Sequence, residues 1–253
     1  MGKRRKRRLS GFGIFLIVLF ITLALFAVLA VTVLFPVKTI TVEGKSQYSA
    51  EQIISASDIS VGNNILLISE NGVSKKVSKQ LPYIASVSVK RDLRGNVVLS
   101  VKNDEKKYSC KTNEGYLIIG GSLKVLEKSE KKAKNTVTLL GVPSSVGIIG
   151  EQFKINDGSK DEIFKQIIEY SKTYDIGFSV IDLSNISDIT AMMNGKIVVK
   201  FGSRDELKNK FAHLKEMRAN LDKSQKGIID LKTWSTEKPE GYFRKQDVSK
   251  YFK

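Results

Sequence analysis

The feature that most constrains this chain is a charge-free apolar run from Phe12 to Phe35, followed at once by a strand pattern. At about 1.5 Å rise per residue, a helix over this run is roughly 36 Å long, which is enough to cross a hydrocarbon core of about 30 Å. Six basic residues precede the run, between Lys3 and Arg8. The positive-inside rule therefore predicts a cytoplasmic tail at 1–11, a transmembrane helix at 12–35 and an extracytoplasmic remainder.

A cleaved signal peptide is the alternative interpretation of this segment. Val28 to Ala30 offers small residues at a possible cleavage site. However, the apolar run continues past that site and is longer than the usual core of about 7 to 15 residues. The sequence therefore favours a membrane anchor that is not removed.

The charge of the chain is strongly positive, at +16. Without the six basic residues of the tail, 36 Lys and Arg still face 26 Asp and Glu. This excess lies on the predicted outer side and lacks the aromatic and basic motifs of nucleic-acid binders, so no nucleic acid is expected as partner. A diffuse basic surface can face anionic lipids or wall polymers, or be simply solvated. The single cysteine, Cys110, rules out an intramolecular disulfide.

Residues 37–103 follow the order strand, helix, helix, strand, strand. The first helix carries Ser49 three residues before Gln52, which is the spacing of a capping box. The second helix has Val73 and Val77 on one face and ends before Pro82. Two alternating strands follow, joined by a charged turn. This order predicts a small α/β domain directly after the anchor.

The segments "FPVKTITVEGKSQYSAEQI", "GNNILLI" and "LPYIASVSVKRDLRGNVVLSVK" resemble the FtsQ/DivIB family of bacterial cell-division proteins. The family's glycine-asparagine step corresponds to Gly62 to Asn64, and its Leu-Pro-Tyr step to Leu81 to Tyr83. The chain has "RDLRGN" and "KNDEKK" where the family often has a proline turn and a Glu-Arg-x-Pro ending. The resemblance implies a POTRA domain at 37–103 with the order β-α-α-β-β.

Residues 104–235 show a different mixture of patterns, which resembles the family's β domain. Amphipathic helices are expected at 160–174 and 204–221, and the Asn194-Gly195 pair predicts a tight hairpin. A last strand is expected at 227–234, followed by a flexible tail at 236–253 that contains Pro239 and Gly241. The predicted fold class is therefore α+β, with a transmembrane helix, a POTRA domain and a mixed α/β domain that ends in a strand.

No residue pattern predicts catalysis, a cofactor site or a metal site. His213 is the only histidine, so a zinc site with Cys110 would lack ligands. A Cys110–His213 dyad has no third residue to orient it. Ser129 and Lys132 match a Ser-x-x-Lys spacing, but the companion motifs of penicillin-recognising enzymes are absent from the sequence.

The last strand is the predicted partner site, because a terminal strand often lies at a sheet edge that can accept another strand. Alternation places Ile229, Leu231 and Thr233 on one face, toward the core. The other face then carries an exposed set that ends in the chain's only tryptophan: Ile228, Asp230, Lys232 and Trp234. The alternative is that this strand is paired on both sides and that Trp234 caps the core.

The resemblance also implies a function and partners. The family's scaffolds bind the extracytoplasmic parts of small bitopic division proteins, DivIC/FtsB-like and FtsL-like, and through them act on the septal peptidoglycan synthase complex. A noncatalytic divisome scaffold in the cell membrane at the division septum is therefore expected. Two alternatives remain: a membrane-anchored cell-wall enzyme, and a POTRA-containing component of protein transport.

Overall fold

The computed structural model describes residues 11–142, 147–222 and 224–252, without the side chains at 27 and 30–34. The chain divides into two compact units, residues 1–103 and 104–253. Ten of the eleven residues of the predicted basic tail, 1–11, lie outside the described residues.

Helix α1 (Gly11–Leu34) opens the first unit. Its described large apolar side chains, from Phe12 to Leu29, are exposed. Among the described residues, no helix is long and apolar enough to cross a membrane. The transmembrane helix expected at 12–35 therefore stays a prediction.

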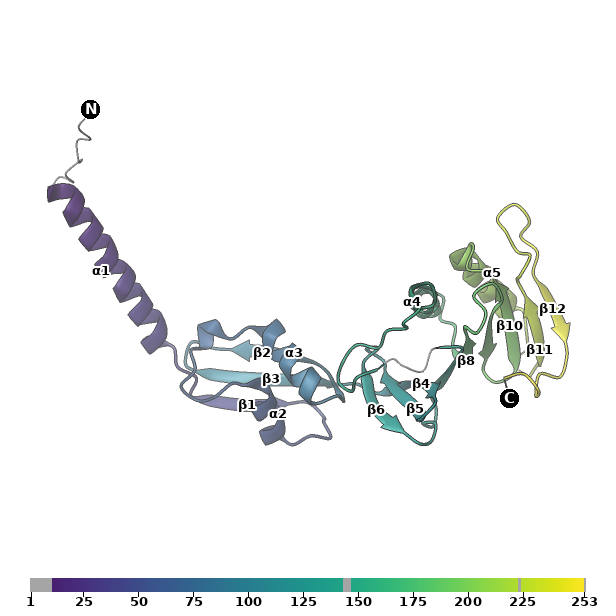
Figure 1. The fold of residues 1–253 in the computed structure, drawn as a ribbon, viewed down its shortest axis with the longest axis horizontal. Coiled ribbons are helices and arrows are strands. Elements are labelled where there is room, and N and C mark those ends of the chain that lie inside the picture. The colour runs from purple at the N-terminus through teal and green to yellow at the C-terminus, as the bar shows by residue number, and fades with distance from the viewer. Residues whose placement is uncertain (1–10, 143–146, 223, 253) are drawn as a thin grey trace, which may run out of the picture. The chain divides into compact units, whose positions relative to one another are not determined.

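The rest of the first unit is a small α/β domain with a three-stranded sheet in the order β1-β3-β2 (Figure 1). Strand β1 pairs parallel with β3, and β2 pairs antiparallel with β3. Its elements are β1 (Thr39–Glu43), α2 (Ala50–Ser57), the 3-10 turn η1 (Ile65–Leu67), α3 (Glu70–Gln80), β2 (Ile84–Arg91) and β3 (Asn96–Asn103). The predicted order β-α-α-β-β is confirmed, with η1 as an addition.

Local signals in the sequence explain why these helices begin where they do. Ser49 and Gln52 form the predicted capping box, with each side chain bonded to the other residue's backbone N–H. The Asn64 side chain accepts from the Leu66 N–H and starts η1. Val73 and Val77 of α3 are buried in a core that also contains residues of all three strands. Burial of one face on each element holds this domain together.

The second unit is built on a nine-stranded mixed sheet in the order β12-β11-β10-β9-β8-β7-β4-β5-β6. Two of its strand pairs join antiparallel strands through tight turns, β4 with β5 and β9 with β10. Its strands and helices are β4 (Lys106–Thr112), β5 (Gly115–Gly120), β6 (Val125–Ser129), β7 (Val137–Leu140), α4 (Gly158–Thr173), β8 (Phe178–Asp182), β9 (Ile189–Met193), β10 (Ile197–Gly202), α5 (Leu207–Ala219), β11 (Gly227–Asp230) and β12 (Tyr242–Lys245).

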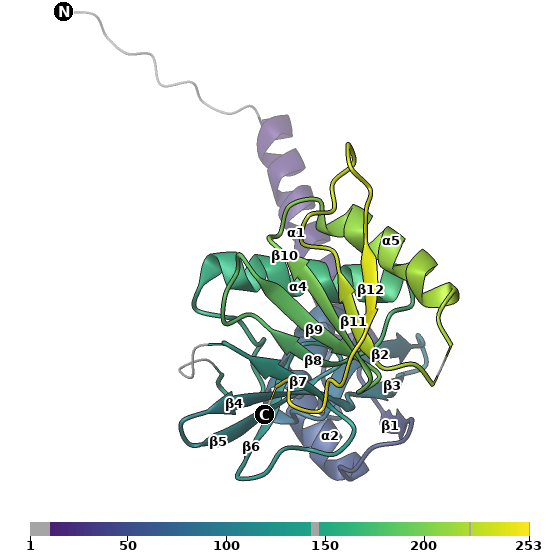
Figure 2. The ribbon, with the colours of Figure 1, turned by 90° about the vertical axis from the view of Figure 1, so that its right-hand side faces the viewer.

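Helices α4 and α5 lie on the same face of this sheet (Figure 2). Their buried residues, such as Phe164 and Phe211, belong to the main core of the unit. A second, smaller cluster lies on the opposite face, where Val248 of the C-terminal segment packs on Val198 and Ile228. The end of the sheet around β10 and β11 is therefore covered on both faces.

Two strands were not expected from the sequence. Strand β4 was missed, and β12 lies in the segment 236–253 that was expected to be flexible. That expectation is wrong in this part, because β12 pairs with β11 along its length and Val248 is buried. Pro239 and Gly241 mark a hairpin between the two strands, and they do not begin a disordered tail.

We expect Phe211→Ala to destabilise the second unit by about 3–5 kcal/mol, the usual cost of removing a buried ring. Phe211 stacks on Phe201 at a centroid distance of 4.9 Å and contacts Phe178 at 5.9 Å. The measurement is urea denaturation of the full chain in a mild detergent. Tyr242→Ala removes an exposed ring and should change stability by only about 0.5 kcal/mol or less. Equal effects of the two substitutions would contradict this account of the core.

Candidate partner-binding edge

Strand β11 does not lie at the edge of the sheet. It pairs parallel with β10 on one side and antiparallel with β12 on the other. The prediction that a partner strand adds directly to this strand is therefore wrong, since its backbone groups already have neighbours on both sides. Among the described residues, the edge of the sheet at this end is β12.

The hydrogen-bond pattern shows which backbone groups of β12 face outward. The Gly227 N–H donates to the Lys196 carbonyl, and the Leu231 N–H donates to the Lys200 carbonyl, both on the β10 side. Backbone N–H groups alternate sides along a strand, so the Ile228 N–H points toward β12. Ile228 lies opposite Arg244 in that pairing. It follows that the N–H and C=O groups of Phe243 and Lys245 face away from β11.

The side chains of β12 divide the edge into an inner and an outer part. Phe243 is half-buried and packs against the main core. Tyr242, Arg244 and Lys245 are exposed. The Tyr242 hydroxyl donates to the Glu240 carboxylate, and this bond raises the pKa of Tyr242 and lowers that of Glu240. The edge thus presents two cationic side chains and one aromatic ring to solvent.

The hairpin between β11 and β12 is tied to the start of α5. The Glu206 carboxylate accepts from the Thr236 N–H at 2.9 Å and also from the Thr236 hydroxyl. These bonds to Thr236 are the main cause that lowers the pKa of Glu206. Ser235 and Lys238 exchange backbone hydrogen bonds, which closes the hairpin. The edge strand is therefore held in two ways: the hairpin before it is bonded to α5, and the strand itself pairs with β11.

The three apolar residues at the start of the predicted site are all buried. Ile229 and Leu231 lie in the main core, on the face that the alternation predicted. Ile228 was expected on an exposed face, but Val248 packs on it and leaves it buried. The sequence could not show this cover, because it comes from a segment about twenty residues further along the chain.

The strand itself ends at Asp230, earlier than expected. The Asp230 side chain accepts from the Lys232 N–H at 3.1 Å and turns the chain out of the sheet. Thr233 is consequently exposed instead of pointing into the core. Lys232 forms an ion pair with Asp188 at 2.7 Å.

Trp234 is half-buried and packs against the main core. Its Nε1 atom is buried, so the polar edge of the indole points into the protein. The ring lies 5.9 Å from that of His213 on α5. The interpretation that Trp234 stands on an exposed face is therefore wrong, and the alternative that it caps the core is correct.

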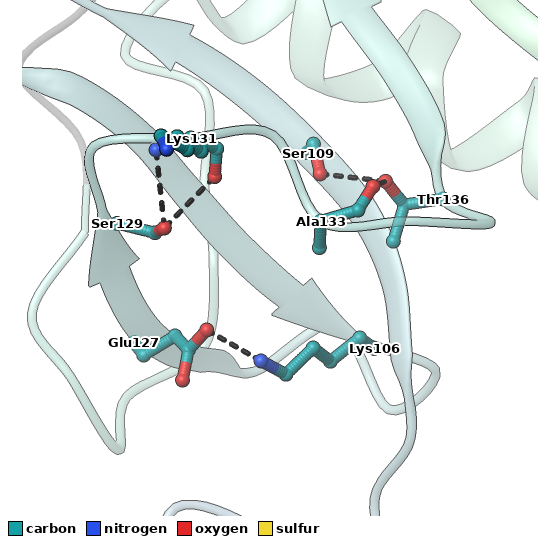
Figure 3. A network of polar contacts seen from close by, with 7 residues as sticks. All are labelled: Lys106, Ser109, Glu127, Ser129, Lys131, Ala133 and Thr136. Carbon is teal, nitrogen blue, oxygen red and sulfur yellow. Dashed lines mark hydrogen bonds and ion pairs between the residues drawn. The ribbon is translucent and has the colours of Figure 1, made fainter.

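The candidate nucleophiles named in the sequence, Cys110 and Ser129, are held by burial or by backbone hydrogen bonds. Cys110 is buried in β4, and this burial raises the pKa of its thiol to about 11. Figure 3 shows that the Ser129 hydroxyl bonds to the backbone C=O and N–H of Lys131. Within the described ranges, no three potential metal ligands among His, Cys, Asp and Glu come together.

Comparisons with known proteins agree with the fold of the first unit. Residues 35–103 match the model of the POTRA domain, FtsQ-type. The chain is 29% identical over 236 residues to the cell division protein DivIB of Clostridium botulinum, which covers 90% of each chain. It is also 29% identical over 200 residues to DivIB of Clostridium acetobutylicum, which covers 78% of this chain and 77% of the relative.

The chain is thus a POTRA-domain protein with a second, mixed-sheet domain. Within that class the comparisons support the FtsQ/DivIB family, which the motifs around Gly62 and Pro82 also resemble.

We expect Gly227→Ala to displace β12 from β11. A Cβ at this position would lie 2.3 Å from the Arg244 carbonyl oxygen and 2.8 Å from the Phe243 ring. Amide hydrogen exchange of Tyr242 and Arg244, whose N–H groups face β11, should therefore become faster, because their pairing is weakened. Gly177→Ala is the matched control, since a Cβ there meets nothing within 4 Å. Unchanged exchange in the Gly227 variant would show that the two strands are not held this closely.

Proposed function

We propose that this protein is a noncatalytic scaffold of the bacterial division machinery, which binds small bitopic division proteins outside the membrane. The observation that carries the proposal is the outward-facing backbone of β12 in a chain whose relatives are DivIB division proteins. Through these partners the scaffold acts on the assembly or regulation of the septal peptidoglycan synthesis complex. The expected partners are DivIC/FtsB-like and FtsL-like proteins.

The mode of binding is the addition of a partner strand to β12. The outward N–H and C=O groups of Phe243 and Lys245 are suited to form a ladder with an extended segment. Arg244 and Lys245 are exposed cations at this edge. They favour a partner segment that carries acidic residues, by charge complementarity.

The residues first expected to contact the partner take different roles in this proposal. Ile228, Ile229 and Leu231 support the edge from within the sheet and do not reach a partner, because they are buried. Asp230, Lys232, Thr233 and Trp234 lie at the end of β11 and in the hairpin that leads to β12. Of these, Lys232 and Thr233 are exposed, and Lys232 lies next to Gly202 of β10 and pairs with Asp188, on the side of β11 away from β12.

A membrane anchor at 12–35 completes the proposed function. It is supported by the charge-free run, by the basic residues ahead of it and by the POTRA domain that starts directly after it. The chain would then be a single-pass protein of the cell membrane, with its N-terminus in the cytoplasm. Both folded units would lie outside, where the division septum forms.

The alternative of a membrane-anchored cell-wall enzyme has less support. Cys110 is buried with a raised thiol pKa, and Ser129 is engaged with the Lys131 backbone. Within the part of the chain that the structure describes, no base is bonded to either of these nucleophiles. A POTRA-containing transport component is likewise less well supported than a division protein, since the curated relatives are named as division proteins.

The first test of the proposal is Lys245→Pro in the full chain. Proline removes an outward N–H and should leave the pairing of β11 with β12 intact, as proline is tolerated at sheet edges. Loss of one or two ladder hydrogen bonds should weaken binding of a DivIC/FtsB-like or FtsL-like partner by about tenfold. The measurement is titration of the purified chain with the partner's extracytoplasmic segment.

Lys245→Ala is the matched control, because it removes the charge and keeps the backbone donor. Lys245→Ala should weaken binding less than Lys245→Pro does. The loss of affinity in Lys245→Ala should be larger at low salt than at high salt, because salt screens the charge that it removes. If both variants fold and bind the partner as the unchanged chain does, the binding site does not lie on β12.

A second test addresses the topology. Lys172 is exposed on α4, so Lys172→Cys offers a thiol at the surface of the second unit, whereas Cys110 is buried. A membrane-impermeant thiol reagent should label this variant in intact cells. Labelling that appears only after lysis would place the unit in the cytoplasm and refute the proposed anchor.

A further inference from the structure

Four exposed apolar side chains gather at one end of the POTRA domain, and we call them the apolar tip. Val61, Leu66 and Leu67 are 69%, 43% and 74% exposed and lie in the loop between α2 and α3. Leu93 is 70% exposed in the turn between β2 and β3. Single exposed apolar residues are ordinary on a protein surface, but a local group of four, including three leucines, points to a contact surface.

One side chain joins the two loops of the apolar tip. The Arg91 guanidinium, at the end of β2, donates to the carbonyl of Ile65 at 3.2 Å and to that of Ile68. The turn that contains Leu93 therefore lies beside the loop that contains Leu66 and Leu67. The loop between α2 and α3 reaches the core through its buried Ile59 and Ile65, while Leu66 and Leu67 of the same loop stay exposed.

The same two loops are bonded to Phe35, the last residue of the charge-free run, and to residues that follow it. The Ile65 N–H donates to the Phe35 carbonyl at 2.9 Å, and the Val37 N–H donates to the Asn63 carbonyl at 2.8 Å. On the other side, the Lys38 N–H donates to the Gly95 carbonyl at 2.8 Å. The apolar tip is thus fixed around residues 35–38, where the chain would leave the membrane.

Glycine is required for one of these contacts. Gly95 has a φ of +103°, and a Cβ on it would lie 2.7 Å from the Pro36 carbonyl oxygen. Gly95 therefore lets the turn with Leu93 approach the start of β1 closely. Leu93 lies two residues before Gly95 in this turn.

Charged side chains of both signs lie around the apolar tip, and the Asp58 carboxylate beside Leu67 is paired with Lys76. Lys38 and Arg94 are exposed next to it, and Arg91 lies between its two loops. Asp92 is the acidic residue of the turn, and its carboxylate is occupied by hydrogen bonds from the Asn96 side chain and from the Arg94 and Asn96 N–H groups. Basic residues beside exposed leucines are the combination that binds an anionic lipid surface.

We infer that the apolar tip inserts into the headgroup region of the membrane and forms a second, noncovalent attachment of the POTRA domain to an anionic bilayer. The inference rests on the membrane anchor of the proposed function. The headgroup region on each side of the hydrocarbon core is only several ångströms thick, and loops bonded to residues 35–38 share the depth of those residues. Leucines at that depth leave water, while Lys38 and Arg94 meet lipid phosphates.

This attachment would limit the orientations of the POTRA domain at the membrane. A domain joined to an anchor through one chain segment can tilt about that segment. A second contact through Leu67 and Leu93 opposes such tilting, because tilting would withdraw these apolar side chains from the headgroup region. The occupant of this surface is lipid, because the loops that carry it are bonded to residues 35–38, where the chain leaves the proposed anchor.

The test uses the full chain with Leu67→Cys, labelled with an environment-sensitive fluorophore and reconstituted into vesicles of zwitterionic and anionic phospholipids. Label emission should shift to shorter wavelength, and spin-labelled lipids should quench it. Gln47→Cys is the matched control, since Gln47 is exposed just beyond β1, at the opposite end of the sheet from Gly95. The unsubstituted chain reports any labelling of Cys110, which is buried.

The outcomes separate this inference from the anchor on which it rests. Water-like emission at both positions, in protein that resists alkaline carbonate extraction, would overturn the apolar tip and leave the anchor in place. Extraction of the protein by carbonate would overturn the anchor and the tip together. If the Leu67 label is shielded only after a division partner is added, the surface binds protein and the inference is wrong.

Two further variants test the composition of the surface. Leu66→Ser combined with Leu93→Ser should reduce the emission shift at position 67, because the neighbouring side chains no longer favour insertion. Lys38→Gln combined with Arg94→Gln should reduce it in anionic vesicles and leave it unchanged in zwitterionic ones. An equal shift in all of these variants would contradict the assigned roles of the leucines and the cations.

Discussion

The contact between Phe201 and Phe211 is the interaction on which the C-terminal end of the sheet depends. Strands β10 and β11 are parallel, so the chain must cross from one end of the sheet to the other between them, and α5 makes that crossing. The two rings stack at 4.9 Å with an interplanar angle of 13°, one from β10 and the other from α5. By holding α5 on the sheet, this contact sets where β11 lies, and hence where β12 can pair.

Much of the fold follows from local patterns in the sequence. The Asn194-Gly195 turn was correctly predicted, since both residues have positive φ and β9 and β10 pair antiparallel around them. The capping box at Ser49 and the amphipathic helices were also found. These features depend on residues within a few positions of one another, and their physical causes are visible in a short segment.

The features that the sequence did not reveal are those that depend on distant neighbours. Alternation of Ile228 and Ile229 predicts a strand, but it does not tell which strands lie beside it or what covers each face. The cover of Ile228 by Val248 and the edge position of β12 arise from the return of the C-terminal segment onto the sheet. Strand β12 has only four residues, Tyr242–Lys245, and no clear alternation of apolar and polar side chains, so its pattern alone does not distinguish it from a loop.

The composition of β12 also explains how a free sheet edge can persist in a folded domain. An exposed edge invites uncontrolled pairing between copies, and natural sheets oppose this with short edge strands and charged side chains. β12 has both properties, because it is four residues long and carries Arg244 and Lys245. Two copies that met edge to edge would bring these cations together, whereas an acidic segment of another protein would neutralise them. The cations that oppose pairing between two copies of β12 are thus also the side chains that favour an acidic partner.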